Sequence, residues 1–362
     1  MKIFALYLPQ FHEIKENNEW WGEGFTEWIN VKKALPLYKG HIQPRHPKNG
    51  NYYDLMDKST VEWQTSLMNN YNVDGFIYYH YYFEGKLLLE KPAENLLKWK
   101  EVKQKFFFNW ANHSWNRSWK GSKELLLKQT YGNEESWKKH FEYLLPFFKD
   151  DRYEKIENKP VFMIYDTNFT EMVPMFNKFN EWCLKEGFNG IYIIEEHMNL
   201  DLKKYESAHY DINYYITQPY VGKKMYLNDS IIRKYCYKIR NRLVQKGLLK
   251  CVEKYDANKL IRMYMKKMPR NCNLINGIYF EWDNTPRHGY RGSVIEPISK
   301  ETFFEYMNSI SKNDYVVVNA WNEWAEGMIL EPTEENGFQY LEWIKEWKET
   351  QIIQSAVGES KP

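Results

Sequence analysis

Short apolar runs alternate with longer segments of helical periodicity along this chain of 362 residues. Eight of the runs predict strands, because each is a few residues long, rich in β-branched or aromatic residues, and bounded by polar or turn-forming residues. The predicted strands are Ile3–Leu8, Gly75–His80, Lys105–Trp110, Pro160–Tyr165, Gly190–Glu195, Asp211–Tyr215, Gly277–Trp282 and Tyr315–Ala320.

Between these strands, apolar positions recur at helical spacing. The predicted helices are Thr60–Tyr71, Ala93–Trp99, Glu135–Phe148, Glu171–Glu186, Ser230–Lys246 with Ala257–Met268, Ser299–Ser311 and Gly337–Lys348, with a short, weak signal over Leu200–Ala208. Eight alternating units of strand and helix favour parallel strands with crossover helices, and therefore a single α/β domain with a closed (β/α)8 barrel. We assign residues 1–350 to this barrel and expect residues 351–362 to form a flexible tail.

The most informative motif follows the last predicted strand. Residues Val316 to Pro332 read VVVNAWNEWAEGMILEP, so Glu323 and Glu326 come at or just past the carboxyl end of an apolar run. Barrel enzymes carry their chemistry at that end of the strands, and glycosidases use paired carboxylates. The alternative is that the glutamates merely decorate an exposed loop. The flanking tryptophans and amides argue against it, so we interpret Glu323 and Glu326 as a candidate catalytic pair.

Aromatic residues point to the type of ligand. They make up 18% of the chain, with 15 Trp and 29 Tyr, which is more than a core needs, although many will fill the core. Rings of this kind stack on sugar rings while offering a hydroxyl or indole N–H to sugar hydroxyls. Several other strand ends and connections are equally aromatic, namely NEWWGEGFTEW, FIYYHYYFEG, FFFNWANHSWNRSWKG and GIYFEWDNTPRHG. We therefore expect long, aromatic-rich loops at one barrel face to form a cleft for an oligo- or polysaccharide.

These segments supply the candidate substrate-binding residues. They are Tyr7, Trp21, His80, Asn112, Trp115, Asp283, Arg287, Asn322 and Trp324. For His80, a buried core histidine is an equally good interpretation, and Asp283 with Arg287 could instead form a buried ion pair that steadies its loop. Arg287 would otherwise suit a carboxylate or phosphate on the substrate. Glu195 and Glu196 are adjacent, so only one of them can face the site.

At the level of motifs the chain resembles the WbsX family of bacterial surface-polysaccharide gene clusters, which is related to glycoside hydrolase family 99, the endo-α-mannosidases and endo-α-mannanases. The resemblance runs from YLPQFHEIKENNEWWGEGFTEWINVKKALPLYKGHIQP through YYHYYFEGKLLLEKP, NWANHSWNRSWKG and WDNTPRHG to NAWNEWAEGMILEP. The sequence departs from the family's usual pattern at Tyr82, at His113 and at Lys120. The last two residues stand where acidic ones are common, so they add positive charge near the cleft.

The resemblance implies a barrel with a metal-independent glycosidic site. It implies that Glu326 is the acid/base and that Glu323 withdraws the proton from the sugar 2-hydroxyl, which then attacks within the sugar and gives retention. Trp321 and Trp324 are expected to exclude water and raise the pKa of one carboxyl. The resemblance leaves a second function open, because WbsX proteins are also labelled glycosyltransferases of lipopolysaccharide, O-antigen or capsule synthesis.

Nothing in the sequence indicates a cofactor or a metal site. The four cysteines, at positions 183, 236, 251 and 272, have neither metal-ligand spacing nor the pattern of a disulfide framework, which favours free thiols in a reducing compartment. A nucleotide-sugar transferase would be expected to carry a D-x-D triplet or a Gly-rich phosphate loop, and the sequence has neither. A non-catalytic glycan-binding module would be expected to lack one of the two glutamates.

Charge is concentrated in one segment, although the whole chain carries only +2. Between Ile231 and Arg270 there are 13 Lys or Arg residues and two acidic ones. This segment predicts either a solvated helical face or contact with an anionic membrane leaflet or acidic glycan, whereas no motif for nucleic acid accompanies it. The N-terminal MKIFALYLPQFHE predicts a strand and not a signal peptide, and no apolar run reaches about 18 residues. We therefore expect a cytoplasmic protein that contacts the inner membrane at most peripherally.

Overall fold

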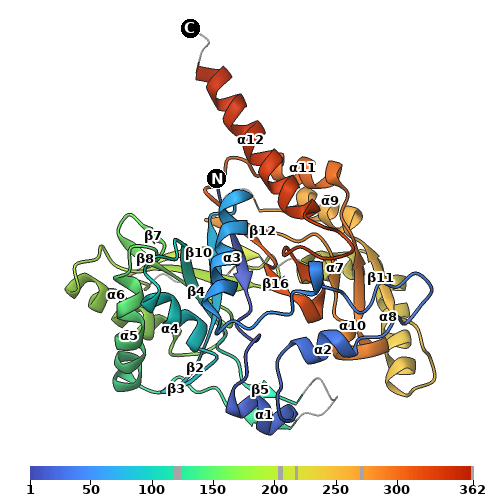
Figure 1. Ribbon diagram of the computed structural model, residues 1–362, viewed down its shortest axis with the longest axis horizontal. Coiled ribbons are helices and arrows are strands. Elements are labelled where there is room, and N and C mark those ends of the chain that lie inside the picture. Colours follow the sequence, from blue (N-terminus) through green and yellow to red (C-terminus); the bar gives the residue numbers. More distant parts are fainter. Residues whose placement is uncertain (118–123, 203–206, 217–218, 270–272, 360–362) are drawn as a thin grey trace.

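Eight parallel strands close into a barrel in the computed structural model, which describes residues 1–117, 124–202, 207–216, 219–269 and 273–359 (Figure 1). The barrel strands are β1 (Lys2–Tyr7), β2 (Gly75–Phe83), β4 (Phe106–Trp110), β8 (Lys159–Ile164), β9 (Tyr192–His197), β10 (Asp211–Ile216), β12 (Leu274–Ile278) and β15 (Tyr315–Val318). Each pairs with the next in parallel, and β15 returns to β1 with Tyr315 opposite Lys2. The predicted (β/α)8 barrel is confirmed.

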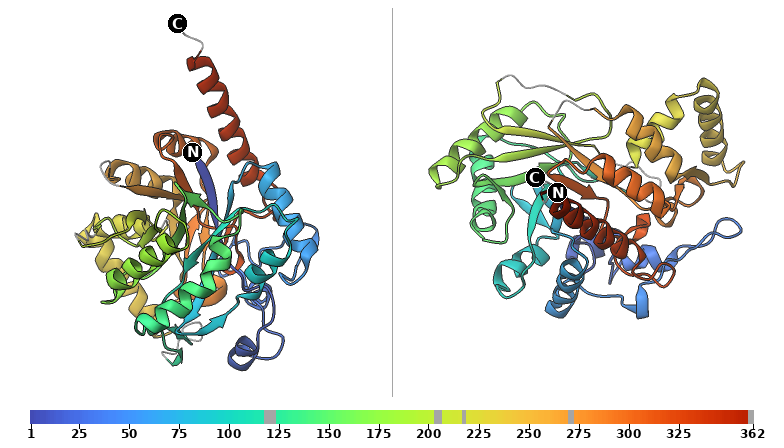
Figure 2. Two further views of the ribbon diagram at one scale, coloured as in Figure 1. Left: turned by 90° about the vertical axis from the view of Figure 1, so that its left-hand side faces the viewer. Right: turned by 90° about the horizontal axis from the view of Figure 1, so that it is seen from above.

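Helices cover the outside of this barrel (Figure 2). They are α3 (Lys58–Asn70), α4 (Lys91–Lys98), α5 (Glu134–Phe148), α6 (Met172–Lys185), α9 (Ala257–Lys267), α11 (Lys300–Ser309) and α12 (Gln339–Glu359). Several begin at a capping side chain, as the Asp256 carboxylate does for α9 by accepting from the amides of Asn258 and Lys259. The weak helix prediction over Leu200–Ala208 is not met at residues 200–202 or 207–208, and residues 203–206 lie outside the described part.

Helix α12 continues well beyond the predicted end at Lys348. It reaches Glu359 and extends away from the end of the barrel at which β1 begins, while residues 360–362 lie outside the described part (Figures 1 and 2). In the part of the chain that the structure describes, no helix combines the length and the apolar character that crossing a membrane requires.

Additional short elements are inserted between the strands and helices of the barrel. The helices are α1 (Lys15–Trp21), α2 (Trp28–Lys33), α7 (Tyr220–Asn228), α8 (Ile231–Gln245) and α10 (Thr285–His288), with 3-10 turns η1 (Lys48–Gly50), η3 (Gly289–Arg291) and η4 (Trp324–Glu326). The short strands are β3 (Lys86–Leu88), β5 (Trp115–Asn116), β6 (Leu125–Leu127), β7 (Lys155–Ile156), β11 (Glu253–Asp256), β13 (Trp282–Asp283), β14 (Ser293–Glu296), β16 (Asn322–Glu323) and β17 (Met328–Ile329). Of these helices, the sequence predicts only α8.

The seventh strand is the one whose predicted position is wrong. We predicted Gly277–Trp282, but β12 ends at Ile278, and Trp282 belongs to β13, which pairs with β14 in a separate sheet. Asn276 and Gly277 resemble turn residues in the sequence, yet both are inside the strand. Asn276 is buried and accepts a hydrogen bond from the Tyr264 hydroxyl at 2.9 Å. Gly277 leaves room for the Tyr215 ring, since a Cβ there would lie 2.8 Å from its Cε2.

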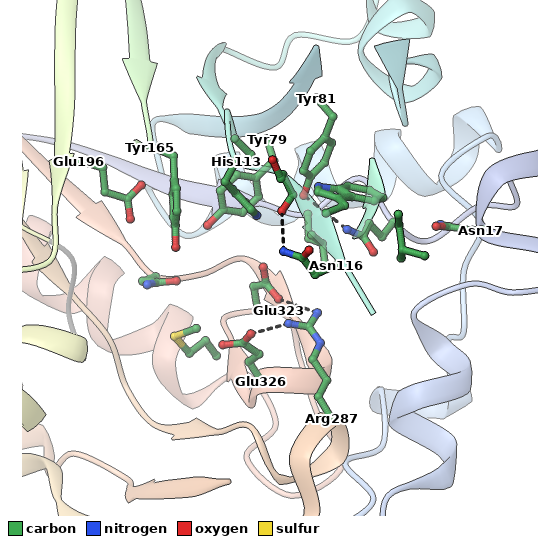
Figure 3. A pocket seen from close by; sticks show the side chains of 18 of the residues that line it. Asn17, Tyr79, Tyr81, His113, Asn116, Tyr165, Glu196, Arg287, Glu323 and Glu326 are labelled. Carbon is green, nitrogen blue, oxygen red and sulfur yellow. Dashed lines mark hydrogen bonds and ion pairs between the residues drawn. The ribbon is translucent and has the colours of Figure 1, made fainter. Parts of the chain in front are cut away.

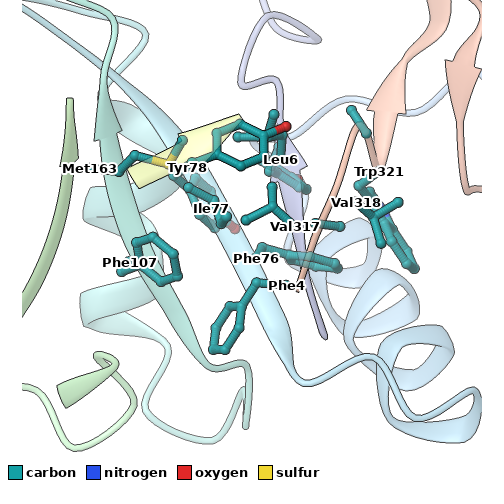
Figure 4. Close-up of a cluster of buried hydrophobic side chains, with 14 of the residues drawn as sticks. Phe4, Leu6, Phe76, Ile77, Tyr78, Phe107, Met163, Val317, Val318 and Trp321 are labelled. Carbon is teal, nitrogen blue, oxygen red and sulfur yellow. The ribbon is translucent and has the colours of Figure 1, made fainter. Parts of the chain in front are cut away.

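Large aromatic side chains fill the barrel interior (Figure 4). Phe4 and Phe107, from β1 and β4, pack with ring centroids 5.1 Å apart, and Tyr7 lies 4.3 Å from Tyr78. Among the described residues, the almost fully buried tryptophans include Trp110, Trp321, Trp324 and Trp347. Much of the aromatic excess in the sequence therefore belongs to the core, while a smaller set remains for the cleft.

Gly75, the first residue of β2, tests how tightly this interior is packed. In Gly75→Ala, the added Cβ would overlap the Phe4 ring and lie 2.7 Å from the Lys105 carbonyl oxygen. We expect the substitution to lower the free energy of unfolding by about 1–3 kcal/mol, the usual cost of overpacking, as measured by urea denaturation. A second substitution, Phe4→Leu, should restore part of the loss. Unchanged stability of Gly75→Ala would contradict this description of the interior.

Candidate active site

A pocket of about 350 Å³ opens at the carboxyl ends of the barrel strands (Figure 3). Side chains from several loops line it, among them both candidate catalytic glutamates and Arg287. Of the other predicted site residues, Trp21 and Trp115 are also in its lining. The remaining six, Tyr7, His80, Asn112, Asp283, Asn322 and Trp324, contribute to its surroundings but not to its wall.

The two glutamates are presented by a hairpin that follows β15. Strands β16 and β17 pair antiparallel, with Glu323 opposite Met328, and Glu326 ends the intervening turn η4. The Asn322 side chain fixes this hairpin to the end of β1, because it accepts from the Leu8 amide at 2.7 Å and donates to the Leu8 carbonyl at 3.1 Å. Asn322 is thus buried and has a positioning role. Gly327 closes the turn with φ 63°, a conformation that suits glycine.

Arg287 connects the glutamates to a third carboxylate. Its guanidinium pairs with Glu326 and lies 3.4 Å from Glu323 (Figure 3). It also contacts the buried Glu27 at 2.8 Å. The indole N–H of Trp282 donates to the other oxygen of Glu326 at 3.0 Å. Arg287 follows β13 on α10 and Glu27 precedes α2, so separate loops supply the members of this cluster. Glu27 is not among the site residues predicted from the sequence, although it lies in the NEWWGEGFTEW segment.

Burial and charge divide the protons among these groups. Burial raises the pKa of Glu323 to about 8, with the charge of Arg287 opposing that rise and the charge of Glu326 adding to it. Burial alone would lower the pKa of Arg287, but the charges of Glu27, Glu326 and Glu323 hold it well above its ordinary value. Arg287 is therefore a permanent cation, and the pair of catalytic candidates holds a proton near neutral pH.

The tryptophans of the motif contact a different carboxylate. Trp321 and Trp324 donate their indole N–H groups to Glu331 at 2.9 and 2.7 Å, and they turn away from the pocket. The expectation that these rings wall a catalytic carboxyl is therefore wrong. Gln64 and Tyr53 also donate to Glu331, each through a short hydrogen bond. A buried polar network thus underlies the hairpin that carries Glu323 and Glu326, and burial raises the pKa of Glu331 to about 7.

Asp283 takes a structural position beneath Arg287. Its carboxylate accepts from His41 and Gln43, both at 2.7 Å, and from the amide and hydroxyl of Thr285 at the start of α10. Burial would raise the pKa of Asp283, but these hydrogen bonds hold it below its ordinary value. Asp283 thus steadies its loop through His41, Gln43 and Thr285, whereas the alternative interpretation expected it to do so through an ion pair with Arg287. Arg287, by contrast, reaches the pocket.

Three further predicted residues lie outside the pocket wall. His80 is buried on the other side of β2, 2.9 Å from Nε2 of His140, and burial lowers its pKa to about 3, as for a core histidine. The Asn112 amide joins two strand ends by bonding both the amide and the carbonyl of Asp166. Tyr7 is inside the barrel, where its hydroxyl donates to Gln64 at 2.7 Å.

Tyrosines that the sequence analysis missed form much of the wall. They are Tyr79, Tyr81, Tyr165 and Tyr220. Strand alternation could have identified two of them, because Tyr79 and Tyr81 point to the side opposite His80. Tyr220 lines the same pocket as Glu326, and the charge of Glu326, followed by burial, raises the pKa of Tyr220 well above its ordinary value.

The remaining side of the pocket combines a histidine with an acid. His113 is in the lining, and burial lowers its pKa, whereas Lys120 lies outside the described residues. Of the adjacent pair at the end of β9, only Glu196 lines the pocket, where it accepts from Asn109 at 3.0 Å. Glu195 is buried elsewhere, beside His197, as strand alternation requires.

Known proteins resemble this chain in sequence over nearly its whole length. The model of the family described as "Glycosyltransferase WbsX" matches residues 3–344. Proteins of two strains of Xanthomonas campestris pv. campestris, each described as uncharacterized protein WxcX, are 29% identical to it over 353 residues. Those alignments cover 94% of this chain and 48% of each relative. The chain thus spans about half the length of the curated relatives it matches.

Solved structures share the fold. The GH99 endo-α-mannosidase of Bacteroides thetaiotaomicron, in complex with bis-tris-propane, has a TM-score of 0.60 at 14% identity, with 98% of each chain covered. A structure described as a glycoside hydrolase-like protein has a TM-score of 0.58 at 12% identity, covering 96% of this chain and 93% of that one. At such identities the likeness shows a common barrel architecture.

The raised pKa of Glu323 predicts a pH-dependent cost in stability. The pKa of Glu323 is 4.5 in the unfolded chain and about 8 in the folded chain. At a pH between these two values, Glu323 has released its proton in the unfolded chain but keeps it in the folded chain. The wild type should therefore lose stability as pH rises through this range, by at most about 1.4 kcal/mol per pH unit from this group. Glu323→Gln should lack that loss and be more stable than the wild type at pH 8, with no advantage at pH 4.5.

Urea denaturation at a series of pH values measures this difference. Glu342→Gln, at an exposed position on α12, serves as the matched control and should follow the wild type throughout. Parallel pH curves for the wild type and Glu323→Gln would show that Glu323 is ionised in the folded protein.

Proposed function

Because the chain belongs to the WbsX family, we propose that it is a carbohydrate-active enzyme, a retaining and metal-independent glycoside hydrolase that acts on a bacterial surface polysaccharide of the O-antigen or capsule type. One observation carries the proposal: Glu323 and Glu326 both contact Arg287 in a pocket walled by Tyr and Trp. Paired carboxylates provide the acid and the base of glycosidic cleavage, and aromatic walls suit sugar rings.

The resemblance to family 99 assigns the steps. Glu326 gives its proton to the departing glycosidic oxygen, while Glu323 takes the proton of the 2-hydroxyl, whose oxygen attacks the anomeric carbon from the opposite face. Water then opens the resulting three-membered ring at the anomeric carbon and loses a proton to Glu326. Two inversions at that carbon give net retention, and each carboxyl ends in its starting state after Glu323 returns its proton to the 2-oxygen.

The groups around the two glutamates favour a different starting position for the proton. Burial keeps the proton on Glu323, whose pKa is about 8, whereas Glu326 accepts from two donors, Arg287 and the Trp282 indole. The assigned roles thus need that proton to pass to Glu326 when substrate binds. A hydroxyl placed beside Glu323 would favour this transfer, because it hydrogen-bonds to the ionised form.

Glycosyl transfer is the second candidate function. It is favoured by the description of the matching family as a glycosyltransferase. The same acid/base pair could pass the sugar to a hydroxyl of another glycan in place of water. A transferase that uses a nucleotide sugar would instead need a diphosphate site. Arg287, the cation beside the two glutamates, already contacts three carboxylates, which argues against its binding a diphosphate.

Mass spectrometry of reaction products separates these functions. The chain is incubated with a panel of bacterial O-antigen and capsular polysaccharides, with and without sugar nucleotides. We expect shortened oligosaccharides without any nucleotide. In ¹⁸O-labelled water, the new reducing end should carry the label in a hydrolysis. Products that form only with a sugar nucleotide, and that gain its sugar, would establish the transferase instead.

Substitution of either glutamate by glutamine should abolish turnover and keep the fold. Glu323→Gln and Glu326→Gln each remove an ionisable group at nearly constant volume, so we expect losses of about 10²–10⁴-fold in kcat on the polysaccharide identified above. Glu342→Gln should retain full activity. If both site variants kept more than a tenth of wild-type activity, the pair would not be catalytic.

A substrate with an activated leaving group distinguishes the two roles. An aryl glycoside of the identified sugar needs little protonation, so the variant that lacks the acid should recover most of its activity on it. We expect recovery for Glu326→Gln and not for Glu323→Gln. The opposite result would exchange the roles and would agree with the charge distribution of the unliganded site.

A further inference from the structure

Helix α8 lies at the edge of the molecule, outside the helices that pack on the barrel (Figures 1 and 2). Its inward side holds it in place: Arg240 donates to the Tyr290 carbonyl at 2.7 Å, and Val244 is buried. Arg233 lies over the Tyr226 ring, 4.4 Å from its centroid, and pairs with Asp229. These residues serve the fold, which leaves the opposite side of α8 facing outward.

That outward side carries a continuous apolar row. The side chains of Ile231, Ile232, Tyr235, Ile239 and Leu243 are 84%, 75%, 66%, 52% and 36% exposed. Four of the five follow one another at intervals of four residues, so they share one face of the helix. Single exposed apolar residues are common on protein surfaces, whereas a contiguous row of this size marks a surface that contacts something.

A basic row runs directly beside the apolar one. Lys234, Lys238, Arg242 and Lys246 are also spaced by four residues, and all are exposed. The sequence of α8 contains no Asp or Glu. Among the residues that the structure describes, no carboxylate forms an ion pair with any of the four, so their charge is uncompensated.

These two rows together match one kind of partner. Helices that lie in the plane of a bilayer bury an apolar face at the acyl boundary while Lys and Arg stay among the anionic headgroups. An acidic polysaccharide would neutralise the basic row but leave the isoleucines in water, and a second copy of α8 would bring two basic rows together. We propose that the outward face of α8 docks the chain on an anionic lipid bilayer, with its apolar row inserted.

The position of α8 gives this docking a defined geometry. Tyr290, whose carbonyl Arg240 holds, is three residues beyond Arg287, so α8 is attached to the loop that supplies the central cation of the pocket. A bilayer bound at α8 would therefore lie beside the pocket and not at the far end of the barrel, where β1 begins. The pocket would face glycans at that bilayer surface. The docking itself does not depend on the proposed function, because its test measures binding alone.

Co-sedimentation with lipid vesicles tests the proposal. The full chain is mixed at low salt with vesicles of phosphatidylcholine alone or with a third of phosphatidylglycerol. We expect binding to the anionic vesicles only. Lys234→Glu/Lys238→Glu/Arg242→Glu should weaken partition by at least about tenfold, because each cation near an anionic surface contributes to binding. Ile239→Ser/Leu243→Ser should also weaken it at least about tenfold, since both remove inserted apolar surface.

Matched variants control for net charge and for apolar surface elsewhere. Lys103→Glu/Lys185→Glu/Lys312→Glu makes the same change in net charge at exposed positions on other elements, and Leu184→Ser removes an exposed leucine of α6. Both should bind anionic vesicles as the wild type does. The proposal is overturned if the wild type does not bind anionic vesicles. It is equally overturned if Lys103→Glu/Lys185→Glu/Lys312→Glu loses as much binding as Lys234→Glu/Lys238→Glu/Arg242→Glu. It is also overturned if sedimentation velocity shows a dimer that Ile239→Ser/Leu243→Ser dissociates.

Discussion

The guanidinium of Arg287 is the interaction on which the site depends. Glu27, Glu323 and Glu326 converge on it from different loops, and Glu27 is completely buried. Without a cation at their centre, the ionised forms of carboxyl groups gathered here would be strongly disfavoured in so dry an environment. Arg287 therefore joins the loop before α2 to the catalytic hairpin, and it sets how many protons the cluster holds. The Asp283 network beneath it fixes the start of α10, from which Arg287 extends.

Glu331 supports the hairpin through a second, buried network. It receives hydrogen bonds from Trp321 and Trp324, which flank Glu323 in the sequence, as well as from Gln64 and Tyr53. A buried network whose members are mutually satisfied restricts the groups that it includes to one arrangement. The catalytic pair is thus held between two polar clusters, one that exposes charge to the pocket and one that is sealed in the core. The abundance of Trp in the motif serves this second cluster.

The sequence predicted features that depend on local pattern. Seven of the eight barrel strands and the placement of Glu323 and Glu326 beyond the last one follow from apolar runs and their ends, and the structure has them, whereas the seventh strand lies earlier in the chain than predicted. The sequence could not predict which of the polar side chains beyond the strand ends face the pocket. Asn112, Asn322 and Asp283 have the polarity of ligand-binding groups, but they bond backbone or buried partners. Glu27 was missed because its importance comes from Arg287, which is 260 positions away in the chain. Such pairings depend on tertiary geometry and leave no periodic signal.

The carboxylates around Arg287 also bear on which sugars the pocket can accept. Glu27, Glu323 and Glu326 outnumber the single guanidinium, and Glu196 adds a further acid to the wall. Even with Glu323 protonated, the ring bound at the reacting position meets an excess of negative charge. A uronic acid there would bring a like charge into a poorly screened space, whereas a neutral or amino sugar would not. For the proposed function, this implies that the acidic units of a polysaccharide would bind farther from the bond to be cleaved than a neutral or amino sugar does.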